Sequence, residues 1–274
     1  MARKTQHTSS LAGLGLTASA GREAQVTGLS VDSRQVEAGH LFAALPGASV
    51  HGAAFIEKAV SLGAVAVLTD AKGAALAADA LTDIATIVAQ DPRQTLAQTA
   101  SLWFGAHPST VVAVTGTNGK TSVSTFARQI WEEMDLPAVN LGTTGVEGAW
   151  NYPLKHTTPE PITLHRVMAE AARNGITYVA MEASSHGLDQ RRLDGVMVAA
   201  AAFTNFTQDH LDYHETFDAY FQAKMGLFTR VLPEDGIAVI NLDDPKGTQV
   251  VQIALSRGQE VIGVGRNPDA LLRL

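Results

Sequence analysis

The sequence predicts an α/β protein, with a small N-terminal α/β domain and a central P-loop domain built on a mostly parallel sheet covered by helices. Three observations indicate this fold class. Near-continuous apolar strands alternate with helical segments, which is the pattern of a parallel sheet buried on both faces. One strand runs directly into a glycine-rich loop and a helix. Hydrophobic residues make up 46% of the 274 residues, enough for a sizeable core.

The smaller domain is expected to span residues 1–90. Short strands and one clear helix are predicted between residues 26 and 90. The strands are 41–45, 65–68 and 84–89, and the helix is 55–62. Pro46-Gly47 is a turn signal after the first strand, and Gly63 suits the position just past a helix end. Asp91-Pro92 then provides an N-cap and a first-turn proline for a new helix. We therefore place the domain boundary near residue 90.

The larger domain, residues 91–274, alternates strand and helix. The predicted strands are 111–114, 178–181, 196–203, 237–240 and 261–264, and the predicted helices are 91–104, 121–134, 161–174 and 216–231. The helix at 121–134 has apolar residues at the 3,4 spacing of an amphipathic helix. These residues are Val123, Phe126, Ala127, Ile130, Trp131 and Met134. The chain stops soon after a strand, at "GRNPDALLRL", so this domain is expected to be incomplete.

Composition and charge exclude several classes of protein. The net charge of -7 and pI near 5.7 argue against nucleic acid as the main partner. Cysteine is absent, which excludes disulfides, thiolate metal sites and a cysteine nucleophile. The apolar part of the N-terminus is too short and glycine-rich for a secretory signal, and no stretch approaches ~18 apolar residues. We expect a cytoplasmic monomer that does not insert into membranes.

A phosphate-binding loop is predicted in "VVAVTGTNGKTSV". Gly116 and Gly119 allow positive φ and close backbone approach, so that loop N–H groups face an anion at a helix N-terminus. Lys120 can reach nucleotide phosphates, and the Thr121 hydroxyl can hold Mg²⁺. Val114 occupies the position where a strict Walker A motif has glycine. The alternative is an ordinary glycine-rich turn before a helix.

A carboxylate is expected at the same sheet edge as this loop. Glu182 directly follows the strand at 178–181, and ligands bind beyond the carboxyl ends of parallel strands. A carboxylate placed there can hold Mg²⁺ beside a triphosphate. The alternative is a solvated acid at a strand end.

Lys224 lies on the apolar face of the predicted helix at 216–231. Phe217, Tyr220, Phe221 and Phe228 share that face. An ammonium drawn onto an apolar face loses hydration and its pKa falls, and a neutral amine can react with CO₂ to form a carbamate. The alternative is a lysine whose stem packs while its head reaches water.

Polar residues that could contact a substrate occur in two segments. Thr157 and Thr158 precede Pro159 in a turn predicted to expose their hydroxyls. Ser184, Gln190 and Arg192 follow in the loop after the strand at 178–181. Arginine can form a forked contact to a carboxylate or phosphate. The alternative is the routine polarity of loops.

Several ordered motifs resemble the Mur ligase family. They are "TGTNGKT" (115–121), "HTTPEP" (156–161), "MEASSHGLDQRR" (181–192), "FTNFTQDHLDYH" (203–214) and "VDSRQVEAGHLFAALPG" (31–47). The resemblance runs from about residue 26 to the end of the chain. It is strongest to members that add the third peptide residue to the cell-wall precursor in peptidoglycan synthesis.

The resemblance implies an ATP-dependent amide ligase that uses Mg²⁺. In this family ATP phosphorylates the D-glutamate carboxylate of UDP-MurNAc-L-Ala-D-Glu, and the amine of a diamino acid attacks the acyl phosphate. Either meso-diaminopimelate or L-lysine is the diamino acid, and the former is the mild preference. Full-length members carry a third domain that binds the amino acid and closes over ATP. The resemblance therefore implies that this chain binds ligands without completing ligation.

The resemblance also implies roles for individual residues. The nucleotide contacts Gly116, Thr117, Asn118, Gly119, Lys120, Thr121, Ser122 and Asn205. The metal ligands are Thr121, Glu182, His210 and a carbamylated Lys224, and the catalytic residues are Lys120, Glu182, His210 and Lys224. The muramyl-dipeptide contacts are Thr157, Thr158, Ser184, Gln190 and Arg192. Val31, Ser33 and the turn at 48–50 match positions that hold UDP, although "ASV" departs from the polar residues expected in that turn.

Three other functions remain open from the sequence. A folylpolyglutamate-type ligase would share the loop and the lysine but bind a pteridine. A non-catalytic nucleotide-binding module is possible in principle, although Lys120 and Glu182 are both present. A simple P-loop kinase gives no reason for a lysine on the apolar face of residues 217–228.

Overall fold

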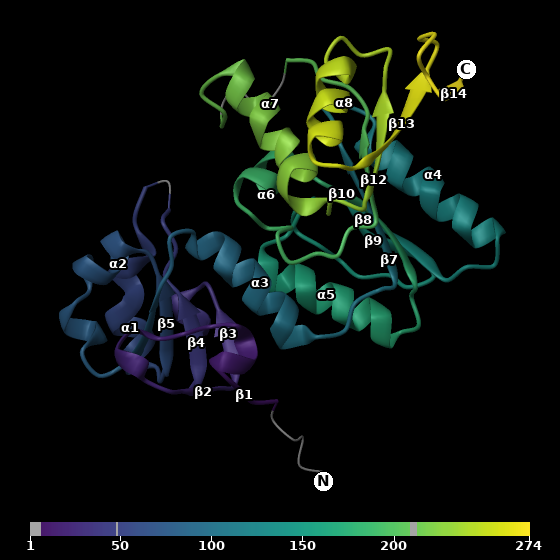
Figure 1. The fold of residues 1–274 in the computed structure, drawn as a ribbon. Coiled ribbons are helices and arrows are strands. Elements are labelled where there is room, and N and C mark those ends of the chain that lie inside the picture. The colour runs from purple at the N-terminus through teal and green to yellow at the C-terminus, as the bar shows by residue number, and fades with distance from the viewer. Residues whose placement is uncertain (1–6, 48, 209–212) are drawn as a thin grey trace. The chain divides into compact units, whose positions relative to one another are not determined.

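The computed structural model describes residues 7–47, 49–208 and 213–274 (Figure 1). It divides into two compact units, Met1–Gly105 and Ala106–Leu274. The predicted boundary near residue 90 differs from this division by one helix, α3 (Pro92–Phe104), which packs on β5 of the first unit. Asp91 caps that helix by accepting from the Gln94 N–H. The cap marks the start of a helix, and only its packing decides to which unit the helix belongs.

The first unit holds a four-stranded parallel sheet. Its strand order is β3 (Gly28–Ser30), β4 (His40–Ala43), β5 (Ala66–Thr69) and β6 (Ala85–Val88). The two short strands β1 (Ser9–Ser10) and β2 (Gln25–Val26) pair antiparallel. The α-helices are α1 (Ile56–Ser61), α2 (Ala71–Leu76) and α3. The sequence pattern predicts one clear helix before residue 90, and the structure adds α2, whose N-terminus Asp70 caps by accepting from the Gly73 N–H at 2.6 Å.

The second unit is built on an eight-stranded sheet in the order β14-β13-β12-β11-β7-β10-β8-β9. The strands are β7 (Thr110–Thr115), β8 (Ala138–Gly142), β9 (Gly145–Gly148), β10 (Tyr178–Glu182), β11 (Ala200–Phe203), β12 (Ile237–Asn241), β13 (Glu260–Gly265) and β14 (Leu272–Arg273). All neighbours pair in parallel except β8 and β9. The predicted α/β class with a mostly parallel sheet is therefore confirmed.

Within residues 106–208 and 213–274, five α-helices flank this sheet. They are α4 (Lys120–Glu133), α5 (Pro161–Arg173), α6 (Ser185–Asp189), α7 (Phe217–Gly226) and α8 (Gly247–Ser256). Alternate strand residues such as Val111, Val179 and Ala201 join residues of α5, α7 and α8 in one buried apolar cluster. Helix α4 instead contacts β7, β8 and β10 from the opposite face (Figure 1). A π-helical turn, Leu227–Val231, continues α7.

The face of the sheet that carries α4 is only partly covered. Ala202, Val239 and Ile262 lie in register on β11, β12 and β13, and each is half-buried rather than buried. The outer side of α4 exposes Phe126, Ile130 and Met134, each at 60% or 61%. The 3,4 repeat predicted for this helix is thus present, and most of its apolar stripe faces away from the sheet. Among the described residues, no helix is both long and apolar enough to cross a membrane.

Candidate active site

A cavity of about 540 Å³ lies at the carboxyl edge of the second unit's sheet. It is lined by residues 117–121, Thr143, 156–158, Glu182, 184–186, Arg192 and Lys224. Most of these residues lie at or just after the ends of β7, β8 and β10, while residues 156–158 precede α5, Arg192 follows α6 and Lys224 lies on α7. Parallel strands bring their carboxyl ends to one edge, which is where ligands bind in open α/β sheets.

The glycine loop between β7 and α4 forms one wall of this cavity. Gly116 has φ 148° and Gly119 has φ 86°, a region that L side chains rarely adopt. A Cβ on Gly116 would also collide with the hydroxyl of Thr204. Two glycines are therefore required for this loop to turn from the strand into the helix, as the sequence predicts.

Two lysines meet at one carbonyl of the loop. Lys120 Nζ donates to the Gly116 carbonyl at 3.0 Å and to the Thr117 carbonyl at 2.8 Å. Lys224 Nζ donates to the same Gly116 carbonyl at 2.7 Å and lies 4.5 Å from the Tyr220 ring centroid. Lys224 is 1% exposed. The sequence pattern placed this lysine on a buried face, and in the structure its amine reaches the glycine loop.

The segment after β11 holds the far side of the glycine loop. Asn205 accepts from the Asn118 N–H at 2.9 Å and donates to the Asn118 carbonyl at 3.0 Å. The Thr204 hydroxyl donates to the same carbonyl at 2.7 Å. Asn205 was predicted to contact nucleotide, and in this structure its amide braces the loop. Ser122 is exposed at the start of α4.

Glu182 is a buried carboxylate opposite the loop. It is 2% exposed, and its Oε1 accepts from the Thr121 hydroxyl at 2.9 Å and from the Thr143 N–H at 3.0 Å. A Cβ at Gly142 would collide with this carboxylate, so the end of β8 must be glycine for Glu182 to take this position. Glu182 and Thr121, predicted as joint metal ligands, therefore lie side by side.

Thr143 is a site residue that sequence analysis missed. Its backbone and hydroxyl both approach Glu182, and its hydroxyl lies 3.1 Å from the Thr157 hydroxyl. The available signal was "LGTTG" (141–145), polar and small residues directly after an apolar run. The run that precedes it is short and contains Asn140, so the sequence alone does not predict a strand whose end lies at the sheet edge.

The two threonines before Pro159 differ in their surroundings. Thr157 is half-buried, whereas Thr158 is 1% exposed. The Thr158 hydroxyl donates to the Glu182 carbonyl at 3.0 Å and accepts from the Ser184 N–H at 3.2 Å. Thr158 therefore holds the ends of two segments together, while the exposed hydroxyl expected from the turn belongs to Thr157.

Arg192 reaches the cavity from the turn after α6. Its guanidinium donates to the Thr158 carbonyl at 2.5 Å and to Gln190 Oε1 at 2.8 Å. The preceding residue, Arg191, has φ 60°, and this left-handed conformation just past the end of α6 aims the chain back toward the cavity. Of the three residues predicted together, Ser184 and Arg192 line the cavity, and Gln190 contacts Arg192 from outside that lining.

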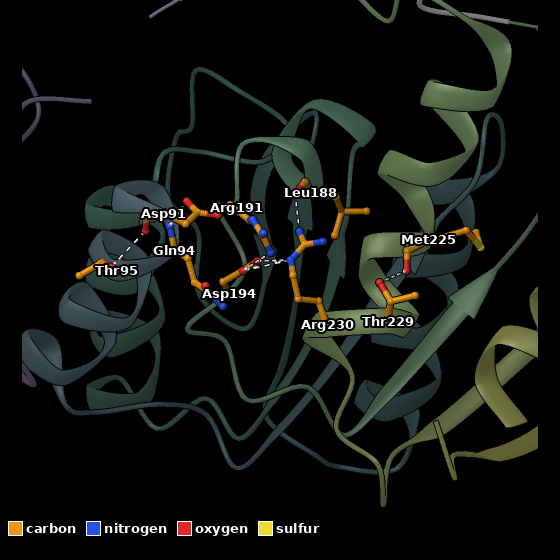
Figure 2. A network of polar contacts seen from close by, with 9 residues as sticks. All are labelled: Asp91, Gln94, Thr95, Leu188, Arg191, Asp194, Met225, Thr229 and Arg230. Atoms are coloured by element: carbon orange, nitrogen blue, oxygen red, sulfur yellow. Dashed lines mark hydrogen bonds and ion pairs between the residues drawn. The ribbon is translucent and has the colours of Figure 1, made fainter. Parts of the chain in front are cut away.

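A buried ion-pair network fixes this turn (Figure 2). Asp194, whose side chain is 2% exposed, pairs with Arg191 at 3.2 Å and with Arg230 at 3.0 Å. Arg230 also donates to the Leu188 carbonyl at 2.6 Å. Arg230 lies in the π-helical turn that continues α7. The network therefore connects the turn after α6, which carries Arg192, to the helix that carries Lys224.

The predicted UDP contacts lie in the first unit. Val31 is 37% exposed and Ser33 is 7% exposed. Between them, Asp32 forms a 2.7 Å ion pair with Arg34, whose side-chain hydrogen bond holds the pKa of that carboxyl at about 2. Ala48, of the predicted 48–50 turn, and His210, the predicted second metal ligand, lie outside the described residues.

The donor atoms of the cavity fit a magnesium nucleotide. The Glu182 carboxylate and the hydroxyls of Thr121 and Thr143 are hard oxygen ligands of the kind that Mg²⁺ prefers, and both hydroxyls lie within hydrogen-bonding distance of the carboxylate. Among the residues that the structure describes, no group of three or more His, Cys, Asp or Glu residues is arranged to hold a metal ion. A site made from this set thus depends on hydroxyl oxygens and on the ligand's own phosphates.

Comparison with known proteins gives matches along most of the chain. Residues 114–273 match the model described as "Mur ligase middle domain", and residues 25–103 match "Mur ligase family, catalytic domain". The UDP-N-acetylmuramoyl-L-alanyl-D-glutamate--2,6-diaminopimelate ligase of Brucella melitensis is 49% identical over 245 residues, which cover 89% of this chain and 49% of the relative. The ligase of the same name from Rhizobium meliloti is 49% identical over 247 residues, covering 89% and 50%.

Solved structures agree with this result. A UDP-N-acetylmuramoyl-L-alanyl-D-glutamate--2,6-diaminopimelate ligase superposes with a TM-score of 0.76 at 31% identity, covering 89% of this chain and 49% of that chain. A folylpolyglutamate synthase/dihydrofolate synthase from Yersinia pestis reaches 0.50 at 15% identity, covering 63% and 48%, and shares the fold alone. The chain spans about half the length of the curated relatives it matches.

Proposed function

The chain belongs to the Mur ligase family, and from that premise we propose that it serves the ATP-dependent ligation of a diamino acid to UDP-MurNAc-L-Ala-D-Glu. The proposed diamino acid is 2,6-diaminopimelate, as in the names of relatives that are 49% identical. This reaction extends the peptide of a cell-wall precursor. A cytoplasmic location follows from the proposed use of ATP and a nucleotide-activated substrate, and we propose that the chain is a monomer.

One observation carries the proposal. A single cavity is lined by the glycine loop, by the buried carboxylate of Glu182 and by the guanidinium of Arg192. An ATP-dependent ligase must hold a triphosphate and an acidic acceptor against each other, because the reaction joins the two. The loop supplies backbone N–H groups at a helix N-terminus for phosphate, and Arg192 supplies a planar fork for a carboxylate or phosphate.

The proposed chemistry has two steps. A carboxylate oxygen of the D-glutamate attacks the γ-phosphorus of ATP, the bond to the β,γ-bridging oxygen breaks, and ADP leaves. The diamino acid then attacks the acyl carbon through its neutral amine, phosphate leaves, and the amine loses a proton to give the amide. Lys120 would orient the phosphates. Its ammonium lies at the loop that would hold them, within 3.0 Å of two loop carbonyl oxygens.

Mg²⁺ would be held by Thr121 and Glu182, with His210 and a carbamylated Lys224 as further ligands. When bound, the metal would offset the negative charge of the phosphates and bring them within reach of the acceptor. The buried position of Lys224 beside Gly116 supports its part in this set. Intact mass measured in bicarbonate buffer tests the modification, because a carbamate adds one CO₂ to the chain. A bare amine under all bicarbonate concentrations contradicts it.

The remaining muramyl-dipeptide contacts would come from Thr157, Thr158, Ser184 and Gln190. Val31 and Ser33 of the first unit would contact UDP. A folylpolyglutamate-type ligase is the second candidate, and only the shared fold supports it. A non-catalytic nucleotide-binding module has less support, because the loop lysine and the buried carboxylate are both in place.

Calorimetric titration separates these functions. We expect the chain to bind UDP-MurNAc-L-Ala-D-Glu and to show no binding of dihydropteroate at the same concentrations. Arg192→Lys should weaken precursor binding about tenfold, since a lysine cannot reproduce the fork. Arg173→Lys, at the exposed end of α5, is the matched control. Binding of the pteridine in place of the precursor would overturn the proposal.

A further inference from the structure

A row of hydrogen bonds links the cavity to Tyr213, which lies in the segment 203–214 and to which the sequence assigns no role. Arg192 donates to Gln190 Oε1 at 2.8 Å, and Gln190 Nε2 donates to the Tyr213 hydroxyl at 3.1 Å. The Tyr213 hydroxyl donates in turn to Asp189 Oδ2 at 2.8 Å. The row thus begins at a cation that lines the cavity and ends at a carboxylate outside it.

The chemistry of the four groups gives this row one direction. A guanidinium can only donate and a carboxylate can only accept. Gln190 must therefore turn its carbonyl oxygen toward Arg192 and its NH₂ toward Tyr213, and the tyrosine proton must point to Asp189. Hydrogen bonds aligned between opposite charges polarise one another, which strengthens the row. Removing the tyrosine hydroxyl would leave Gln190 free to turn its amide away from Arg192.

Packing holds the tyrosine ring in place. Its centroid lies 3.9 Å from that of His186 and 4.8 Å from that of His214. His186 lines the same cavity as Arg192. Tyr213 itself is 37% exposed, so its hydroxyl is not needed to fill the core. The ring therefore packs against His186, and the hydroxyl is linked through Gln190 to Arg192, so both contacts lead to the same cavity.

We propose that Tyr213 is a positioning residue for the acidic precursor. Acting through Gln190, it fixes the guanidinium of Arg192 in the orientation that receives the negatively charged part of the muramyl dipeptide. This inference rests on the proposed function. It adds a residue from the segment after β11 to the substrate side of the site, which otherwise comes from residues 156–158 and 184–192.

Tyr213→Phe tests the inference, because it removes only the hydroxyl. The dissociation constant for UDP-MurNAc-L-Ala-D-Glu should rise about tenfold, the usual scale of one hydrogen bond that acts on a charged group. Affinity for Mg-ATP and the melting temperature should not change, since the ring is retained. Tyr178→Phe, on β10 against Trp131, is the matched control and should leave precursor affinity within about twofold of wild type.

A double-mutant cycle shows whether the tyrosine acts through the arginine. In an Arg192→Lys background, Tyr213→Phe should raise the dissociation constant less than about twofold further, because the orientation it maintains is already lost. Additive effects, an unchanged dissociation constant in the single variant, or an equal loss of Mg-ATP affinity would each overturn the role. Failure of the wild-type chain to bind the precursor would instead overturn the proposed function, and this inference with it.

Discussion

His165 shows how a single buried side chain can set the pH response of the fold. It lies on α5 with 2% of its surface exposed, and burial together with nearby His107 lowers its pKa to about 3. The imidazole is therefore neutral in the folded chain. Unfolding returns it to water, where the pKa is near 6.5.

The sign of the effect follows from these two pKa values. Between about pH 6.5 and pH 3, the His165 imidazole is protonated in the unfolded chain and neutral in the folded chain. Above about pH 6.5, His165 is neutral in both states and the free energy of unfolding has its full value. Below that pH, protonation of His165 in the unfolded chain lowers the free energy of unfolding by at most about 1.4 kcal/mol per pH unit. We expect His165→Gln to flatten the pH dependence between pH 6.5 and 4 in urea titrations. His156→Gln, which changes an exposed imidazole, should keep the wild-type slope. An unaltered slope in His165→Gln would contradict the assignment.

Asp194 is the second residue whose burial has a measurable consequence. Its carboxylate is 2% exposed and pairs with Arg191 and Arg230. Asp194→Ala should lower the free energy of unfolding by about 3–5 kcal/mol, because two guanidinium groups lose their shared counter-ion. Glu234→Ala breaks the exposed pair with Arg257 and should cost less than about 1 kcal/mol. Equal costs in chemical denaturation would show that the network does not brace the turn.

Single residues were predictable from sequence where a local pattern was violated. Lys224 interrupts an apolar face, and the structure buries it. Thr143 and Tyr213 carry no such violation. Their roles depend on which strand ends and loops meet at the sheet edge, and that is decided by strand order rather than by neighbouring residues.

At the scale of elements, helix α4 has the apolar spacing of an amphipathic helix, but most of its apolar side is exposed. Phe126 on its outer side is 60% exposed, whereas Phe221 on α7 is 1% exposed. We expect Phe126→Ala to change the free energy of unfolding by less than about 1 kcal/mol. Phe221→Ala should cost about 3–5 kcal/mol through lost burial and a cavity. Thermal and denaturant unfolding of the two variants measures the difference, and similar losses would mean that the outer side of α4 is covered.

Two elements of the second unit are hidden in the sequence for different physical reasons. Strand β8 has Asn140 at its centre, where Arg128 Nε donates to its side-chain oxygen at 2.7 Å. A polar residue in a short run hides a buried strand, because its partner comes from a distant helix. Helix α6 has five residues, too few for a helical period to be visible. The strands β7, β10 and β12 and the helices α3, α4 and α5 were predicted closely from their apolar runs, whereas the ten-residue helix α8 was not predicted.

At the scale of the whole molecule, the two units should respond differently to nucleotide. The proposed phosphate contacts all lie in Ala106–Leu274. A ligand at 100 times its dissociation constant stabilises what it binds by about 2.7 kcal/mol. Mg-ATP should therefore slow hydrogen exchange in β7, α4 and β10 and leave β4 and β5 unchanged. Lys120→Ala should abolish the protection. Equal protection of both units, or none, would contradict a nucleotide site in the glycine loop.

The division into two units was only partly visible in the sequence. Both units alternate strand and helix, so no change of pattern marks the boundary between them. The capped start of α3 was the best local signal, and it lies one helix before the division that the contacts give. Long-range packing decides such a boundary, and packing is not a local property of residues.

The partly covered face of the large sheet has a consequence for handling the protein. Ala202, Val239 and Ile262 are half-buried there, and the apolar flank of α4 is exposed. Apolar surface that meets water is attractive to other apolar surface in solution. Ammonium sulfate should thus precipitate the isolated chain at low concentration, and a phenyl resin should retain it although its net charge is -7.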